Sequence, residues 1–309
     1  MFKPIFYDPT KIGTVYQVRF PEIFSEAAKI ELAPAVKDKK RVALLAIDMQ
    51  VDFCHKDIGS LYVPGAEKDI QRTIEFLFNN IDKITSCFSS LDTHIIYQIF
   101  YKTWWVKEDG SYVDAFTMIT SEDIKNGKYR ALIDPVWSLD YVKKLEDQTQ
   151  KPLMVWPFHT MLGTVGHIMD PSLYEAFYFH AAARKHQLTL LSKGIIPQTE
   201  MYGILSPEVQ VPKHPMGGFN TSFLKLMTGH DILFIVGQAK SHCVLETIRQ
   251  IHDYFQNDLS VLEKVYILED CMSSVQHPDV DFEAIAQTEF AKFKKSGMNI
   301  IKSTDVDFL

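Results

Sequence analysis

The sequence predicts an α/β protein in which a single domain is built on a six-stranded, mostly parallel sheet with helices on both faces. Two observations predict this class. Apolar runs of strand length and segments of helical periodicity alternate along the whole chain. The run 41–48 is apolar almost throughout, as expected of a central strand that is buried on both faces. Such alternation is typical of a parallel sheet between two layers of helices, which predicts a three-layer architecture.

The strands are expected where apolar runs stop at a turn or at a charged residue. The run 41–48 ends on the carboxylate of Asp48, and the run 232–236 stops at Gly237. Residues 95–100 read Ile-Ile-Tyr-Gln-Ile-Phe, which indicates the second strand along the chain. The six expected strands are 41–48, 95–100, 188–194, 232–236, 265–269 and 299–302.

The helices are expected where apolar residues recur every three or four positions. Between Glu67 and about Ser90 this spacing places five apolar residues on one face, namely Ile70, Ile74, Leu77, Phe78 and Ile81. The short amphipathic segment Glu22–Leu32 ends before Pro34, which cannot continue a helix. The expected helices are 22–32, 67–90, 171–186, 220–228, 244–255 and 281–296.

Two segments depart from the alternation of strand and helix. Residues 1–40 have little periodicity, and we expect an N-terminal extension that wraps on the surface or on a partner subunit. Residues 41–309 are expected to form the domain itself. Within it, the polar, glycine-containing and aromatic segment from about 103 to 152 is predicted to be an insertion that acts as a lid or an interface.

Composition excludes several classes of function. The 309 residues are 46% hydrophobic and 23% charged, as in an ordinary soluble globular protein. A net charge of −7 argues against a nucleic-acid partner, because phosphate binding needs clustered lysine and arginine. Neither a membrane-spanning run nor a signal-peptide core is found, so we expect a cytoplasmic protein with no membrane partner. The four cysteines are too scattered for a disulfide framework or a CxxC zinc site.

Cys243 lies where a reactive thiol is expected. The strand 232–236 leads through a short turn to this cysteine, which begins the helix 244–255. The unpaired N–H groups and the positive dipole end of a helix N-terminus favour thiolate and could bind an oxyanion. The alternative is that Cys243 is a small buried hydrophobe, as most cysteines in such positions are.

Three expected strands end on or lead to a reactive side chain: Asp48, Lys193 and Cys243. A carboxylate can take the proton of a thiol and pass it to a leaving amine, and a nearby ammonium stabilises the thiolate. Because the carboxyl ends of parallel strands meet at one edge of a sheet, these groups could converge there. The alternative is a surface ion pair between Asp48 and Lys193 that contributes almost nothing to stability.

A second group of residues has the chemistry of a metal site. Asp92, His94 and His159 offer one carboxylate and two imidazoles, which suit zinc, iron or manganese and leave coordination positions open. An Asp-x-His pair is a weak signal, since a histidine in a loop is more often a structural hydrogen-bonding residue.

Four motifs together resemble the isochorismatase-like cysteine hydrolase superfamily, and within it they are most similar to nicotinamidases. The resemblance runs in the family's order from about residue 41 to the C-terminus, apart from the insertion. The motifs are Ala46-Ile-Asp-Met-Gln-Val-Asp-Phe53, Trp156-Pro-Phe-His159, Ser192-Lys-Gly194 and Gly237-Gln-Ala-Lys-Ser-His-Cys-Val244. The resemblance implies that Asp48, Lys193 and Cys243 form a catalytic triad.

The resemblance also implies the rest of the site. It implies a cis peptide at Gln238–Ala239 and an oxyanion hole made by the N–H groups of Ala239 and Cys243. It makes Asp92, His94 and His159 the ligands of a divalent metal, zinc before iron or manganese, that holds a pyridine nitrogen. The substrate ring would lie among aromatic side chains, namely Phe53, Trp156 and Tyr202. One departure concerns the metal, because Gln98 stands near the place where many nicotinamidases have a further histidine.

The function that follows is hydrolysis of a small carboxamide through a thioester, with nicotinamide converted to nicotinate and ammonia. The partner is then a small-molecule amide, and a homo-oligomer is expected because relatives commonly form one. Two alternatives stay open. One is a metal-independent isochorismatase-like hydrolase of another small substrate, and the other is a non-catalytic member that uses the sheet as a scaffold.

Overall fold

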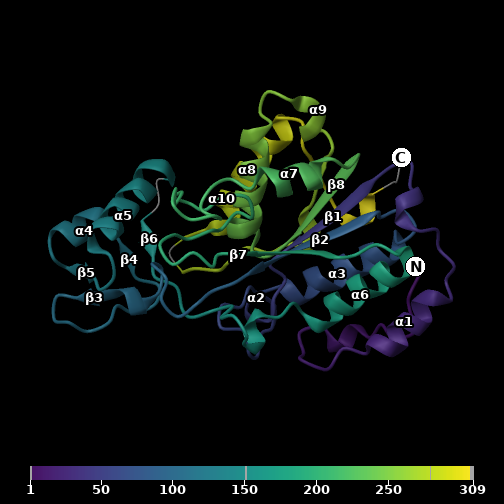
Figure 1. Ribbon diagram of the computed structural model, residues 1–309, viewed down its shortest axis with the longest axis horizontal. Coiled ribbons are helices and arrows are strands. Elements are labelled where there is room, and N and C mark those ends of the chain that lie inside the picture. The colour runs from purple at the N-terminus through teal and green to yellow at the C-terminus, as the bar shows by residue number, and fades with distance from the viewer. Residues whose placement is uncertain (1, 150–151, 279, 307–309) are drawn as a thin grey trace.

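A computed structural model describes residues 2–149, 152–278 and 280–306, and its centre is one six-stranded parallel sheet (Figure 1). The strands are arranged in the order β10-β9-β8-β1-β2-β7. Their bounds are β1 (Val42–Ile47), β2 (Ser86–Asp92), β7 (Thr189–Lys193), β8 (Ile232–Gly237), β9 (Val265–Leu268) and β10 (Asn299–Ile301). All five pairings between neighbours are parallel. The predicted class and strand number are confirmed.

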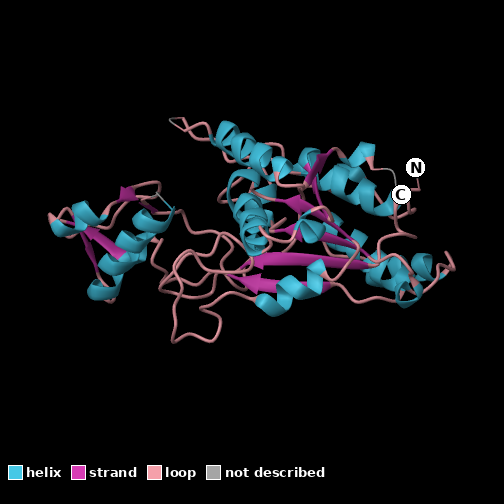
Figure 2. Ribbon diagram, turned by 90° about the horizontal axis from the view of Figure 1, so that it is seen from above, coloured by secondary structure: helices cyan, strands magenta, loops and turns pink. Residues whose placement is uncertain are grey.

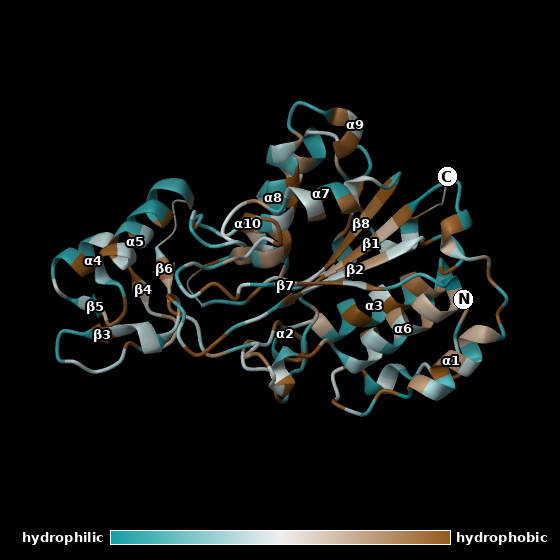
Figure 3. Ribbon diagram, in the orientation of Figure 1, coloured by the Kyte–Doolittle hydropathy of each residue, from teal (hydrophilic) through white to brown (hydrophobic). Residues whose placement is uncertain are grey.

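Helices cover both faces of the sheet, as the buried central strand requires. Side chains of a strand alternate between its two faces. In β1, Leu44 packs into the core cluster beneath α1 (Phe20–Ala28), α3 (Ala66–Asn79) and α6 (Pro171–Arg184). Its neighbour Leu45 packs into the opposite cluster, beneath α7 (Thr221–Thr228), α8 (Leu245–Tyr254) and α10 (Phe282–Lys295). Figure 3 shows β1 and β8 as the apolar centre between these layers.

The second strand differs from the prediction. The helical pattern ends at Asn79 and β2 runs over Ser86–Asp92, whereas residues 95–100 form turns. The sequence Ser-Cys-Phe-Ser-Ser-Leu-Asp is too polar to be recognised as a buried strand. Its hydroxyls are accommodated because they find partners, since Ser90 Oγ donates to Asp48 Oδ1 at 2.7 Å and Ser86 Oγ lies 2.9 Å from His230 Nε2.

The expected insertion forms a lobe at one end of the molecule, beside the sheet (Figure 2). We call residues 103–149 with 152–154 the insert lobe. Its core contains Trp104, Trp105 and Tyr141, all fully buried. Two small antiparallel pairs hold it together, β3 with β5 and β4 with β6. The elements are β3 (Trp105–Lys107), β4 (Met118–Ile119), α4 (Ser121–Lys125), β5 (Tyr129–Ala131), α5 (Pro135–Thr149) and β6 (Leu153–Met154).

The N-terminal segment lies against the protein's own surface. Helix α1 packs on α6, where the rings of Phe20 and Tyr178 meet edge to face with centroids 4.9 Å apart. Arg19 Nη2 lies 2.9 Å from Glu175 Oε2, and this glutamate is almost fully buried. The segment therefore completes the outer layer on that side of the sheet.

Short helical turns connect the remaining elements. They are α2 (Val51–Cys54), α9 (Leu259–Leu262), the π-helical turn Lys240–Val244, and the 3₁₀ turns Pro9–Lys11, Ala35–Lys37, Lys102–Trp104, Val165–His167, Glu269–Cys271 and Ser303–Asp305. Among the described residues, no helix is both long and apolar enough to span a bilayer.

Candidate active site

The carboxyl ends of three neighbouring strands, β1, β2 and β7, meet at one edge of the sheet and bring three charged groups together. Asp48 follows β1, Asp92 ends β2 and Lys193 ends β7, and all three side chains are buried. The register places Asp92 directly beside Lys193. Lys193 Nζ lies 3.0 Å from Asp48 Oδ2 and 2.8 Å from Asp92 Oδ1, and it also donates to the carbonyl of Met201 at 3.0 Å.

Cys243 reaches the same cluster from β8. Its Sγ lies 3.7 Å from Lys193 Nζ. The chain passes from Gly237 through a cis peptide at Gln238–Ala239 into the π-helical turn that carries the cysteine. The N–H groups of Ala239 and Cys243 belong to this turn. The structure therefore brings Asp48, Lys193 and Cys243 together.

Burial changes how the thiol must be activated. Burial raises the pKa of the Cys243 thiol well above its ordinary value, and the charge of Lys193 opposes this only in part. The helix N-terminus alone, which the sequence suggested as the source of thiolate, is thus insufficient. A thiol in this setting would need a base, and Asp48 lies on the same ammonium group as the thiol. Its Oδ2 accepts no aligned hydrogen bond among the described residues and has only the ion pair with Lys193.

The two carboxylates beside Lys193 differ in their affinity for protons. Burial raises the pKa of Asp48 above its usual value, and Lys193 offsets only part of this effect. Burial also acts on Asp92, but the nearby His94 and Lys193 outweigh it and hold the pKa of Asp92 well below its usual value. For Lys193, burial lowers the pKa, but the attraction of Asp48 and Asp92 outweighs it and raises the pKa. Of the two carboxyls, Asp48 is therefore the one with the higher affinity for a proton.

Asp92 also belongs to a group of three that could hold a metal ion. The ligand atoms of Asp92, His94 and His159 all lie within 4.8 Å of one another, and all three residues are buried. Asp92 Oδ2 is 2.8 Å from His94 Nε2 and 3.7 Å from His159 Nε2.

The hydrogen bonds around the two imidazoles suit a metal. His94 Nδ1 lies 3.1 Å from the carbonyl of Gly194, and His159 Nδ1 lies 2.8 Å from the carbonyl of Pro157. An Nδ1–H that donates to a carbonyl leaves the lone pair of Nε2 for a ligand. The short contact between His94 Nε2 and Asp92 Oδ2 is then favourable only with a proton or a metal ion between them. Burial, with the charge of His94, lowers the pKa of His159 to about 4, so its imidazole is neutral at pH 7.

Gly194 and Gln98 shape the surroundings of this group. Gly194 has φ +82°, and a Cβ on it would meet Asp92 Oδ1 at 2.7 Å and His94 Cε1 at 2.8 Å. Gln98, in place of a further histidine, uses its side-chain amide to donate to the carbonyls of Gly194 (2.5 Å) and Ile196 (3.3 Å). Gln98 thus supports the loop that carries Gly194 and Ile196. Asp92, His94 and His159 remain as the three candidate ligands of a metal.

A cavity of about 30 Å³ opens between the thiol and this three-residue group. All three aromatic residues that the sequence suggested line it, and Trp156 Nε1 donates to the Tyr202 hydroxyl at 3.0 Å. The cavity has six further lining residues that the motifs do not indicate, namely Leu61, Val63, Glu200, Met201, His242 and Val275. The π-helical turn directs the ring of His242 onto Trp156, with centroids 5.7 Å apart.

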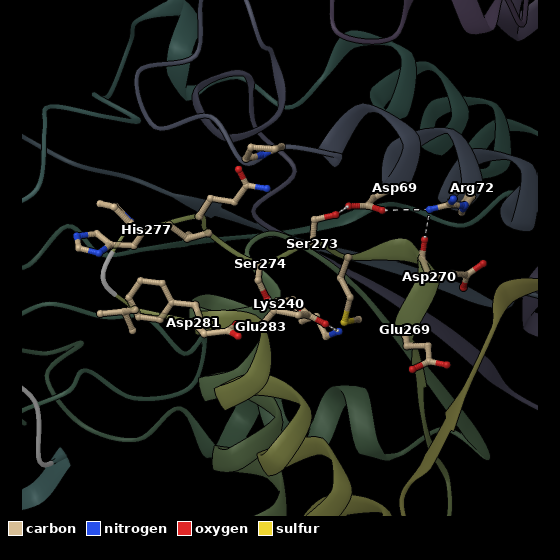
Figure 4. Close-up of a pocket in the computed structure, with 17 residues that line it drawn as sticks. Asp69, Arg72, Lys240, Glu269, Asp270, Ser273, Ser274, His277, Asp281 and Glu283 are labelled. Atoms are coloured by element: carbon tan, nitrogen blue, oxygen red, sulfur yellow. Dashed lines mark hydrogen bonds and ion pairs between the residues drawn. The ribbon is translucent and has the colours of Figure 1, made fainter.

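A polar cluster that includes Asp69, Ser273 and Lys240 lies next to this turn (Figure 4). Asp69, in the first turn of α3, accepts hydrogen bonds from Gln238 Nε2 at 2.8 Å and from Ser273 Oγ at 2.6 Å. The carbonyl of Ser273 accepts from the N–H of Lys240 at 2.8 Å. Both residues that flank Ala239 are therefore anchored. Burial raises the pKa of Asp69 to about 6.

These features define an α/β protein with a buried cysteine, lysine and aspartate beside a group suited to a metal. No family model matches the sequence, and no curated protein matches it by sequence. Solved structures do match. The Acinetobacter baumannii nicotinamidase–pyrazinamidase superimposes with a TM-score of 0.55 at 19% identity, over 87% of this chain and 99% of that one.

Two further structures give the same result. The yeast nicotinamidase bound to the inhibitor nicotinaldehyde matches with a TM-score of 0.56 at 16% identity, over 84% of this chain and 99% of that one. An L. infantum protein in complex with nicotinate matches with a TM-score of 0.51 at 18% identity, over 86% and 95% of the two chains. The chain thus has the isochorismatase-like fold in the form that nicotinamidases have, and the predicted resemblance is confirmed at the level of the fold.

Proposed function

We propose that this chain is a cysteine amidohydrolase that hydrolyses a small carboxamide, with nicotinamide as the first candidate substrate. One observation carries the proposal. The Cys243 thiol and the Asp48 carboxyl both lie within 4 Å of the same buried ammonium group, Lys193 Nζ, beside a group of residues suited to a metal. Solved nicotinamidases share the fold.

The reaction begins with transfer of the thiol proton from Cys243 to Asp48. Lys193 stabilises the resulting thiolate, which attacks the carboxamide carbon. The N–H groups of Ala239 and Cys243 stabilise the oxyanion that forms. Asp48 then gives its proton to the departing nitrogen, so that ammonia leaves and an acyl thioester remains on Cys243.

The second half of the reaction returns the enzyme to its starting state. Asp48, now unprotonated, takes a proton from the water that attacks the thioester carbon. The carbon–sulfur bond breaks, Asp48 returns its proton to the sulfur so that the thiol is restored, and the carboxylic acid leaves. Asp92, His94 and His159 would hold a divalent metal, zinc before iron or manganese, which supplies a Lewis-acidic partner for a heteroaromatic nitrogen. Phe53, Trp156 and Tyr202 would flank the ring.

The test is ammonia release from a panel of carboxamides that begins with nicotinamide, measured with and without a chelator. We expect turnover that chelation diminishes and that Cys243→Ala abolishes while the circular dichroism spectrum stays unchanged. Full turnover by Cys243→Ala would contradict the mechanism. Full turnover after chelation would favour a metal-independent hydrolase of the same fold.

A further inference from the structure

A second cavity, of about 240 Å³, adjoins the catalytic cavity. Residues of the insert lobe and of the helices α8 and α10 line it. Figure 1 shows the insert lobe on the left and the two helices to its right. Four residues line both cavities and form their common wall, namely Trp156, Glu200, Tyr202 and His242. The common wall therefore separates the thiol from a much larger space.

The sizes of the two cavities indicate different uses. The catalytic cavity, at about 30 Å³, is much smaller than the second cavity, at about 240 Å³. A carboxamide group at Cys243 lies in the smaller cavity, and a substituent on the substrate ring needs additional space. The second cavity has the volume to hold a ring substituent or a short chain. A substrate with its amide at Cys243 would extend most readily through the common wall.

The common wall consists of three aromatic side chains and the carboxyl group of Glu200. The ring of His242 lies edge to face with Trp156 and with Tyr202, at centroid distances of 5.7 and 5.6 Å. The hydrogen bond between Trp156 and Tyr202 joins the other two aromatic side chains. Edge-to-face ring contacts are individually weak, so rotation of the His242 ring can open a passage while the hydrogen bond between Trp156 and Tyr202 stays in place.

The lining of the second cavity selects for an apolar group. Its walls come mainly from hydrophobic residues of the insert lobe, α8 and α10, namely Met118, Leu145, Met154, Leu245, Phe282 and Ile285. The guanidinium of Arg249, which also lines it, is already paired with Glu246 at 2.7 Å and with Glu289 at 3.2 Å. Glu200 and Glu208 also line the second cavity, and burial raises the pKa of Glu200 well above its ordinary value. A carboxylate on the substrate would lose its hydration beside these apolar side chains and an already paired guanidinium, so it is disfavoured.

We propose that this second cavity binds an apolar, uncharged or basic substituent, so that the chain prefers aromatic carboxamides larger than nicotinamide. This inference rests on the proposed amidohydrolase function and adds the class of substrate. The insert lobe supplies Met118, Leu145 and Met154 to the lining of the cavity, which gives that lobe a direct part in substrate choice.

The experiment compares kcat/KM for nicotinamide, its propyl- and phenyl-substituted ring derivatives, and a carboxypropyl derivative of similar length. We expect the propyl or phenyl derivative to exceed nicotinamide by roughly 10-fold or more, as for a filled hydrophobic pocket. Among the long derivatives, the carboxypropyl derivative should have the lowest kcat/KM. If nicotinamide is hydrolysed at least as well as every derivative, the inference is wrong while the amidohydrolase proposal stands. If no carboxamide releases ammonia, both are wrong.

Variants test the location of the substituent. Met154→Trp and, separately, Met118→Trp fill the second cavity from the insert lobe, and Leu226→Trp on the exposed face of α7 is the matched control. We expect either filling variant to lower kcat/KM for the long derivatives by roughly 10-fold, while kcat/KM for nicotinamide changes little. Thermal unfolding identifies a variant that fails to fold. Equal losses on nicotinamide and on the long derivatives in both folded variants would contradict the assignment.

Discussion

Asp48 and Asp92 contact the same ammonium group, yet their surroundings give them different chemistry. Asp92 faces His94, His159 and Lys193, and it stays charged. Asp48 has one cation and one hydroxyl donor, Ser90, and burial raises its pKa. The position of each residue in the sequence says nothing of this difference, because it arises from the number of positive groups that the fold places around each carboxyl.

Asp48→Asn tests the proton-carrying role. The amide keeps the size of the side chain but cannot accept the thiol proton, so we expect kcat to fall by roughly 100-fold to 10,000-fold. Metal content should be unchanged, because Asp92, His94 and His159 are intact. Ammonia release and metal analysis measure the two effects, and the exposed Asp82→Asn is the control. Activity comparable to that of the control would exclude Asp48 as the base.

Asp69 offers a test of stability against pH. Its pKa in the folded protein, about 6, lies above the ordinary value of 3.8. The folded state therefore binds this proton more tightly. The contribution of the group to stability is complete below about pH 4 and is lost as the pH rises through about 6.

Asp69→Asn keeps an acceptor for Gln238 and Ser273 but removes the titration. We expect its free energy of unfolding to decline less than that of the wild type between pH 4 and 6, by up to roughly 1.4 kcal/mol per pH unit for one group. Urea unfolding across this range measures the slope, with Asp82→Asn alongside. Parallel curves for the wild type and Asp69→Asn would show that Asp69 does not titrate there.

At the scale of elements, the pairing of β8 with β1 brings the turn that carries Cys243 beside Asp48. Gly237 is the last residue of β8 and pairs with Ile47, next to Asp48. Its φ is +136°, and a Cβ there would meet the backbone oxygen of Ile47 at 2.3 Å. Only glycine permits the two strands to approach so closely at this point.

Gly237→Ala should therefore destabilise the protein by roughly 2–5 kcal/mol, since an unfavourable φ and a clash with backbone add together. Gly218→Ala is the matched control, because nothing lies within 4 Å of the Cβ it would create. Chemical unfolding of both variants gives the comparison. Equal free energies of unfolding for Gly237→Ala and Gly218→Ala would mean that β8 and β1 can move apart at this point without loss of stability.

At the scale of the whole molecule, the metal-type group joins parts of the chain that are distant in sequence. Asp92 and His94 follow the sheet strand β2, whereas His159 follows the insert lobe. A metal bound to all three would connect the lobe's return segment to the sheet. Because it would bind the folded state alone, it would stabilise that state by mass action.

We expect zinc at a hundred times its dissociation constant to add about 2.7 kcal/mol. For a domain of this size that corresponds to a rise of roughly 5 °C in Tm. His159→Ala should lose this rise, and His214→Ala, in the loop after β7, should keep it. Differential scanning calorimetry with and without zinc measures the shift. A rise that survives in His159→Ala would place the metal elsewhere.

The fold class and most elements could be predicted from the sequence, because apolar runs and helical periods are local patterns. β1, β7, β8, β9 and β10 lie in or beside the expected runs. The pattern does not predict β2, because its serines interrupt the apolar run that is typical of a buried strand. Burial of these serines is possible because their hydroxyls form hydrogen bonds to residues far along the chain. The motifs indicated the residues that now lie at the strand ends, since catalytic groups occupy fixed places in such motifs.

The sequence by itself determined which chemical groups are present and on which elements they lie: an acid after β1, a lysine at the end of β7 and a thiol after β8. Only the tertiary structure decided what they can do. The depth of burial, the two carboxylates around one ammonium group and the cavity beyond Trp156 depend on segments that meet across the fold. Electrostatic energies and cavity volumes are set by distances in space, and spacing along the chain does not encode them.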